Sequence, residues 1–176
     1  MSKEIKNFFH AQLDEHELIL KKTRLCNEKE FIKLVNICVD SVKKNKKIIF
    51  FGNGGSAADS QHLATELTVR FSKNRKAIPA LSLVTDTSTI TAIANDFGFK
   101  YLFSRQIEAI GEKGDVAIGI STSGKSANVI EGLKSAKKKN IKCIIFTGKE
   151  SQSFRNYCDC VISIPAKNTS RIQEMH

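Results

Sequence analysis

The stretch that decides the fold is Phe50-Phe51-Gly52-Asn53-Gly54-Gly55-Ser56-Ala57-Ala58-Asp59-Ser60-Gln61-His62. It begins in an apolar run, residues 48–51, whose length is typical of a buried strand. Three glycines within four residues break the run, and residues 57–70 then have a periodicity that predicts a helix. A strand, a glycine turn and a helix in this order direct backbone N–H groups at one point, which favours anion binding.

Three polar side chains extend this prediction. Ser56 is expected at or near the N-cap, where its hydroxyl can bond a backbone donor or a ligand oxygen. His62 and Glu66 are four residues apart, so they project from one face of the helix. Together these residues suggest a site for a small phosphorylated substrate. Two alternatives stay open: a tight turn that only needs glycine, and a solvated ion pair on the helix surface.

A second loop repeats the arrangement. The apolar run 116–120 leads into Ser121-Thr122-Ser123-Gly124-Lys125-Ser126, and a helical pattern follows it. Hydroxyl groups at the head of a helix suit the oxygens of a phosphate, although a serine-rich turn would have the same composition. We call residues 52–55 the glycine loop and residues 121–126 the hydroxyl loop. Because the carboxyl ends of parallel strands lie at the same edge of a sheet, we expect the two loops to converge.

Composition limits the class of protein. The chain has 176 residues, a net charge of +10 and five cysteines, and no apolar run reaches the length of a membrane span. The lysine clusters 43–47 and 137–139 are expected at helix C-termini, and no aromatic residues interleave with them. We therefore expect one domain over residues 1–176, without nucleic-acid or membrane partners, in a reducing cytoplasm with free thiols.

The remaining periodicity predicts alternating helices and strands. Residues 1–45 contain two expected helices, 3–22 and 31–42, which precede the first strand and are candidates for packing against another subunit. Further strands are expected at 80–84, 116–120, 143–146 and 161–164. Further helices are expected at 89–94, 102–110 and after residue 127, with a turn at 95–99 and a last helix from residue 169. This alternation predicts an α/β fold with a parallel sheet.

Four motifs together carry a resemblance. G-N-G-G-S-A-A-D-S-Q-H, N-D-F-G-F, S-T-S-G-K-S-A-N-V-I and R-I-Q-E-M-H closely resemble the sugar isomerase (SIS) domain family over essentially the whole chain. Within it they are most similar to the branch that isomerises heptose phosphates. The resemblance implies a flavodoxin-like fold, with a five-stranded parallel sheet flanked by helices and extra N-terminal helices. It also implies a homotetramer with sites at subunit interfaces.

The resemblance implies an activity and its residues. The expected reaction is aldose–ketose isomerisation of sedoheptulose 7-phosphate to D-glycero-D-manno-heptose 7-phosphate, a step toward the heptoses of bacterial lipopolysaccharide or capsule. The substrate-binding residues would be Asn53, Gly54, Gly55, Ser56, Glu66, Asn95, Asp96, Ser121, Thr122, Ser123, Ser126 and Gln173. One Zn²⁺ per subunit would be held by His62, Glu66 and Gln173. Glu66 is the expected catalytic base, and whether it is base, zinc ligand or both stays open.

One motif departs from the family pattern. The family places a second histidine eight residues after the glutamine, whereas the present sequence reaches His176 three residues after Gln173. We therefore expect the C-terminal helix to be cut short, and treat His176 as a weaker substitute. Two other classes of protein compete with the enzyme: a non-catalytic SIS protein that binds a replication initiator or another partner, and a basic nucleic-acid binder. Retention of His62 and Glu66 favours the enzyme.

Overall fold

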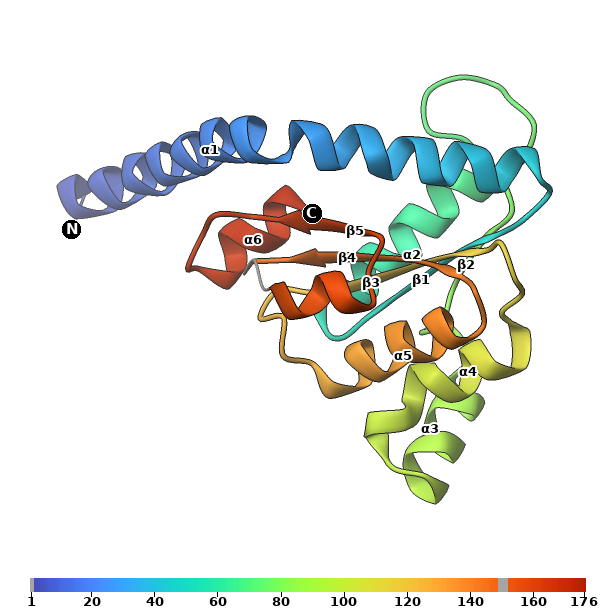
Figure 1. Cartoon of the computed structure of the whole chain (residues 1–176). Coiled ribbons are helices and arrows are strands. Elements are labelled where there is room, and N and C mark those ends of the chain that lie inside the picture. Colours follow the sequence, from blue (N-terminus) through green and yellow to red (C-terminus); the bar gives the residue numbers. More distant parts are fainter. Residues whose placement is uncertain (1, 149–151) are drawn as a thin grey trace.

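A parallel sheet with the strand order β2-β1-β3-β4-β5 forms the middle layer of the computed structural model, which describes residues 2–148 and 152–176 (Figure 1). The strands are β1 (Ile48–Gly52), β2 (Ala80–Ser82), β3 (Val116–Ser121), β4 (Lys142–Thr147) and β5 (Cys160–Ser163). The helices are α1 (Ser2–Lys43), α2 (Gly55–Thr68), α3 (Thr87–Asp96), α4 (Leu102–Ile110), α5 (Ala127–Lys138) and α6 (Thr169–Met175). Two short 3-10 helices, η1 (Phe99–Tyr101) and η2 (Gln152–Asn156), complete the described elements.

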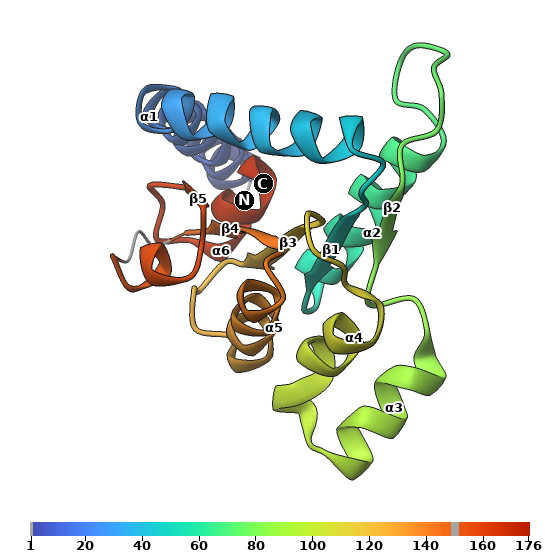
Figure 2. The same cartoon turned by 45° about the vertical axis from the view of Figure 1, so that its right-hand side comes forward.

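Helices cover both faces of the sheet. One face packs against α1, α2 and α6, and the other packs against α3, α4 and α5 (Figure 2). Strand β1 shows how the sequence supplies both layers, because alternate side chains point to opposite faces. Ile48 and Phe50 join the α1–α2 layer, whereas Ile49 and Phe51 join the layer formed by α4 and α5. The α/β fold and the five-stranded parallel sheet are therefore confirmed.

Most helix and strand boundaries in the structure differ by only a few residues from the predicted boundaries. Helix α2 begins at Gly55 rather than at residue 57, and β2 ends at Ser82 rather than at residue 84. Asp86 caps α3, because its side chain accepts a hydrogen bond from the Thr89 amide. The expected turn at 95–99 begins later, since the first two of its residues form the last turn of α3.

The prediction of two N-terminal helices is wrong, because α1 is one continuous helix of 42 residues. The apolar stripe lapses around residues 23–30, yet this segment contains neither Gly nor Pro to end a helix. Its inward-facing residues are polar because they bind the edge strand β5. The Asn27 side chain donates to the Ser163 carbonyl at 2.8 Å and accepts from the Ser163 amide at 3.1 Å.

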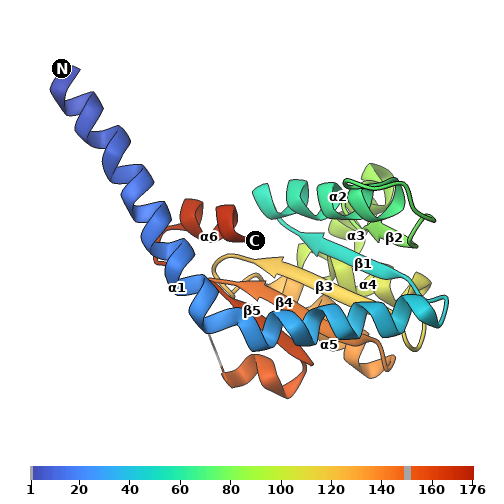
Figure 3. The same cartoon turned by 90° about the horizontal axis from the view of Figure 1, so that it is seen from above.

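The first part of α1 extends beyond the sheet (Figures 1 and 3). Every residue from 2 to 11 is exposed, and contact with the rest of the molecule begins where α1 reaches α6. The basic clusters lie where they were expected, since α1 ends at Lys43 and α5 ends at Lys138. None of the helices in residues 2–148 and 152–176 combines the length and the apolar character of a membrane span.

Candidate active site

The two predicted loops meet at one edge of the sheet. Strands β1 and β3 are hydrogen-bonded neighbours, with Gly52 opposite Ile120, and each strand ends in one of the loops. A reciprocal amide pair joins them: Asn53 Nδ2 lies 2.8 Å from Asn128 Oδ1, and Asn128 Nδ2 lies 2.9 Å from Asn53 Oδ1. Neighbouring parallel strands with connections on opposite faces form a crevice at this edge, the usual ligand site of such sheets.

The glycine loop presents the start of α2 to this crevice. Gly54 is the N-cap, with φ of 56° and ψ of −123°, a conformation that a side chain strongly disfavours. Ser56, which was expected at or near the N-cap, lies two residues after it, buried in the first turn of α2. The first amides of a helix have no intrahelical acceptor, so this end of α2 is chemically suited to an anion.

Hydrogen bonds from both side chains and backbone hold the hydroxyl loop in shape. Ser121 Oγ donates to Ser126 Oγ at 2.9 Å, which ties the end of β3 to the start of α5. The Ser123 hydroxyl accepts from the Lys125 amide at 3.2 Å, and the Thr122 carbonyl accepts from the Gly148 amide at 3.0 Å. These bonds shape the loop around the positive φ of Gly124, 63°.

His62 and Glu66 lie further along α2. His62 Nε2 is 3.3 Å from Glu66 Oε1, and both residues line a groove of about 730 Å³ between α2 and the second half of α1. The His62 side chain is exposed, whereas about a third of the Glu66 side chain is exposed. Gly55 shares their face of the helix, because seven and eleven residues are close to whole numbers of turns. His62 therefore follows the start of α2 by about 10 Å and Glu66 by about 16 Å along one face.

The last helix reaches both parts of this face. The Gln173 side-chain amide lies against Gly55, so closely that a Cβ atom at Gly55 would overlap it. His176 lines the same groove as His62 and Glu66, with its ring centroid 5.8 Å from that of Phe146. Burial lowers the pKa of His176 to about 4, although the backbone of Thr147 partly opposes this shift, so the ring is neutral at pH 7.

Asn95 and Asp96 are not brought to the loops. They lie exposed at the end of α3, on the opposite side of the sheet from α2 and α6. Asn95 Nδ2 donates to Asp96 Oδ1 at 2.8 Å. Within the described ranges, no hydrogen bond joins either residue to another predicted site residue. Their inclusion in the site stays a prediction.

Two residues of the site received no role from the sequence. Asn128 is buried, and its signal was the Asn in S-G-K-S-A-N-V-I, which spacing alone could not pair with Asn53. Asp59 lies on α2 one turn before His62, and its Oδ2 atom is buried with no hydrogen-bond partner among the described residues. Burial raises the pKa of Asp59, and the nearby charge of His62 opposes this shift.

The donor atoms suit zinc, although they are not gathered into a complete cluster. In residues 2–148 and 152–176, no three His, Cys, Asp or Glu side chains lie close enough together to hold a metal ion. Imidazole nitrogen and carboxylate oxygen are ordinary zinc donors, and His62 and Glu66 supply one of each within 3.3 Å. The His176 imidazole lines the same groove and is a further donor of this kind.

Comparison with known proteins adds to this geometry. The SIS domain family matches residues 13–148. A phosphoheptose isomerase of Paramagnetospirillum magneticum is 50% identical over 169 residues, which are 96% of this chain and 88% of that protein. The chain belongs to the phosphoheptose isomerases of the SIS domain family. Phosphoheptose isomerase 1 of Campylobacter jejuni is 45% identical over 170 residues, covering 97% of this chain and 91% of that protein.

Solved structures agree with this membership. A phosphoheptose isomerase from Neisseria gonorrhoeae superposes with a TM-score of 0.90 and 36% identity, over 98% of this chain and 92% of that chain. One from Francisella tularensis gives a TM-score of 0.91 and 27% identity, over 97% and 91%. The phosphoheptose isomerase family is a family of enzymes, so the alternative of a non-catalytic partner-binding protein is not favoured.

Proposed function

We propose that this phosphoheptose isomerase converts sedoheptulose 7-phosphate to D-glycero-D-manno-heptose 7-phosphate, for bacterial lipopolysaccharide or capsule. One observation favours a sugar phosphate with a long carbon chain as the substrate. Chemistry suited to a phosphate lies at the start of α2, and an acid–base pair follows about 10–16 Å along the same face. The substrate carries its groups in the same order, since its phosphate is on C7 at one end of the carbon chain and its reacting atoms, C1 and C2, are at the other end.

The two loops would bind the phosphate end. Ser121, Ser123 and Ser126 offer hydroxyl groups, and Ser56 offers another from the first turn of α2. Hydroxyl and amide donors bind a phosphate without a balancing cation when the helix N-terminus contributes its dipole. The Asn53–Asn128 pair keeps the two loops in register, and Thr122, Gly54 and Gly55 complete the lining that we propose.

Glu66 would move the proton. Its carboxylate takes a proton from C1 of the ketose, which gives an enediol, and returns it to C2 to form the aldose. His62 lies within hydrogen-bonding distance of Glu66. It would exchange a proton with the sugar oxygens as the carbonyl group moves from C2 to C1. The reaction needs no redox partner, because the carbon oxidised and the carbon reduced belong to one molecule.

We also propose that one Zn²⁺ per subunit is held by His62, Glu66 and Gln173. When bound, zinc polarises a carbonyl or hydroxyl oxygen as a Lewis acid. Imidazole and carboxylate are the stronger donors of this set, and the Gln173 amide oxygen is the weaker one. In support, Gln173 reaches the helix face that carries the other two residues.

We propose further that the enzyme is a homo-oligomer, a tetramer by family resemblance. Helix α1 exposes many large apolar side chains, more than a lone soluble helix would leave in water. They are Ile5, Phe8, Phe9, Leu13, Leu18, Leu20, Leu25, Phe31, Ile32, Val35 and Val39. A second copy is the occupant that fits sites at subunit interfaces, which would also give Asn95 and Asp96 a site to join. Five free cysteines are consistent with the cytoplasm as location.

A coupled assay with sedoheptulose 7-phosphate tests the proposed reaction. Replacement Glu66→Gln should lower kcat about 10²–10⁴-fold, the usual contribution of a general base. Glu17→Gln is the matched control, because Glu17 also forms an ion pair four residues along a helix, with Lys21 on α1. A wild-type protein without turnover would refute the reaction. Full activity of Glu66→Gln would refute the role of Glu66.

A further inference from the structure

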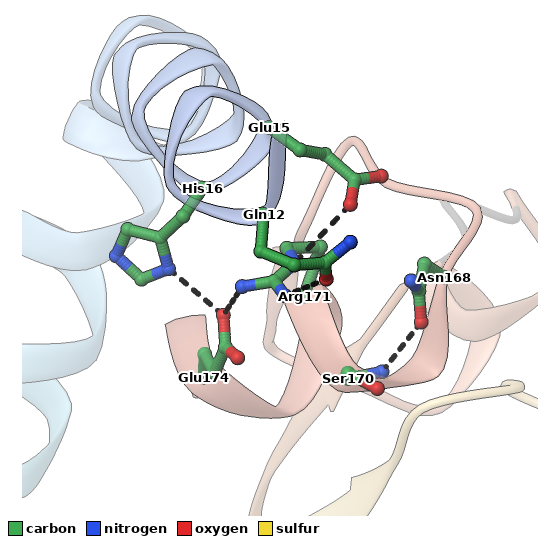
Figure 4. Close-up of polar contacts among 7 residues, drawn as sticks. All are labelled: Gln12, Glu15, His16, Asn168, Ser170, Arg171 and Glu174. Carbon is green, nitrogen blue, oxygen red and sulfur yellow. Dashed lines mark hydrogen bonds and ion pairs between the residues drawn. The ribbon is translucent and has the colours of Figure 1, made fainter. Parts of the chain in front are cut away.

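A buried guanidinium joins the two ends of the described chain. Arg171, in α6, is 8% exposed and bonds side chains of both α1 and α6 (Figure 4). Its Nε lies 3.3 Å from Glu15 Oε2, its Nη2 lies 2.8 Å from Gln12 Oε1, and its Nη1 contacts Glu174. His16 Nδ1 then lies 2.8 Å from the same Glu174 carboxylate. We call these five residues the α1–α6 clamp.

The two residues after Arg171 face other parts of the molecule. Ile172 is buried in the layer between the sheet and α1, α2 and α6, against Gly148 at the end of β4. Gln173 turns toward α2, where its side-chain amide lies against Gly55. Successive helical residues are about 100° apart, so three consecutive side chains attach α6 to α1, to the sheet and to α2. A rotation of α6 about its axis would displace all three together.

Helix α6 cannot keep this pose by itself. It has seven residues, well below the length at which an isolated helix is stable in water. Its cap, a bond from the Ser170 amide to Asn168 Oδ1 at 3.0 Å, fixes where the helix begins but not how it is rotated (Figure 4). Ile172 contributes an apolar contact without directional preference. The clamp supplies directional bonds between side chains of α6 and α1, and Arg171 makes three of its bonds.

We propose that Arg171 is a positioning residue for the isomerase reaction: through the clamp it holds the Gln173 amide beside the glycine loop. This rests on the proposed function, together with the substrate-binding role that the family resemblance implies for Gln173. A planar guanidinium with several donors fixes an orientation, whereas a lysine ammonium supplies a charge without that geometry. The clamp thus links a residue of the site to α1, the helix that offers an apolar surface to a second copy.

The test is a double-mutant cycle on kcat with sedoheptulose 7-phosphate. Arg171→Lys should lower kcat about 10–100-fold, because small misplacements of a catalytic group have effects of this size. The KM should change less than about threefold, since the phosphate loops are untouched. If Arg171 acts through Gln173, Arg171→Lys should have little further effect on kcat in the Gln173→Ala background. Losses that multiply would overturn the proposal.

A control and a second measurement keep the result interpretable. Arg155→Lys is the matched control, because Arg155 also pairs with a glutamate of α1, Glu30, at 3.1 Å but belongs to η2 and not to α6. Hydrogen exchange of the peptide 169–176 should quicken in Arg171→Lys and stay unchanged in Arg155→Lys. Unchanged exchange in both would refute the clamp even if the wild type had no turnover. Absence of turnover with quickened exchange would refute the proposed function alone.

Discussion

Replacement of Gly55 by alanine adds a single methyl group, which should lower kcat while leaving the free energy of unfolding nearly unchanged. Replacement Gly55→Ala places a Cβ atom where the Gln173 amide now lies, so the amide must move. The backbone itself is unaffected, because Gly55 begins α2 without the positive φ that Gly54 has. The displaced group is the far end of a flexible side chain, which can rotate away at small cost.

The expected magnitudes follow from these two observations. Alanine favours a helix over glycine by up to about 1 kcal/mol. A strained rotamer of the displaced Gln173 would cost about 0.5–1.5 kcal/mol. The two contributions nearly cancel, so the free energy of unfolding should stay within about 1 kcal/mol of wild type. The kcat should fall about 10²-fold, because Gln173 no longer reaches the sugar.

Gly54→Ala is the matched comparison. Nothing lies within 4 Å of a Cβ atom at Gly54, but its φ of 56° is strained for alanine. This variant should lose about 1–3 kcal/mol of stability. Urea denaturation and steady-state kinetics measure both quantities for both variants. The reasoning is refuted if Gly55→Ala keeps wild-type kcat, or if it is the less stable of the two proteins.

Three further predictions follow from the loops, the buried histidine and α1. Ser121→Ala should weaken binding of substrate and inorganic phosphate by about 1–2 kcal/mol, and unchanged affinities in calorimetry would contradict the phosphate pocket. His176, whose pKa burial lowers to about 4, binds fewer protons folded than unfolded, so stability should fall as pH drops from about 6.5 to 4. Urea titrations should show this fall weakened in His176→Phe, and an identical pH dependence would refute it. Phe8→Glu together with Phe9→Glu should lower the sedimentation mass, whereas a monomeric wild type would contradict an interface on α1.

The sheet and the loops could be predicted because their signals are local. Each strand is a short apolar run, and Gly54 and Gly124 mark positive φ where a loop turns into a helix. The order of neighbours in a parallel α/β sheet then brings the loops together, which the Asn53–Asn128 bonds confirm. Local pattern and global fold agree at these positions, so the sequence was sufficient.

Other features depend on partners far away in the chain, so periodicity could not reveal them. Asn27 interrupts the apolar stripe of α1, and only the backbone of Ser163 explains why a polar residue faces inward there. Gln173 could be assigned to a site by resemblance, but its contact with Gly55 depends on how α6 is docked. Asn95 and Asp96 were grouped with the site by motif, and no contact within the described chain tests that grouping.

The contacts that dock α1 also have a consequence for folding during synthesis. Asn27 binds Ser163, 136 residues later, and His16 binds Glu174, 158 residues later. At about 5–20 residues per second, a ribosome needs roughly 7–30 s to make the partners of a helix that it made first. Throughout that interval the apolar side chains of α1 have neither β5 nor α6 to pack against. The nascent chain should therefore depend on holding chaperones, and folding should be slow because its decisive contacts are non-local.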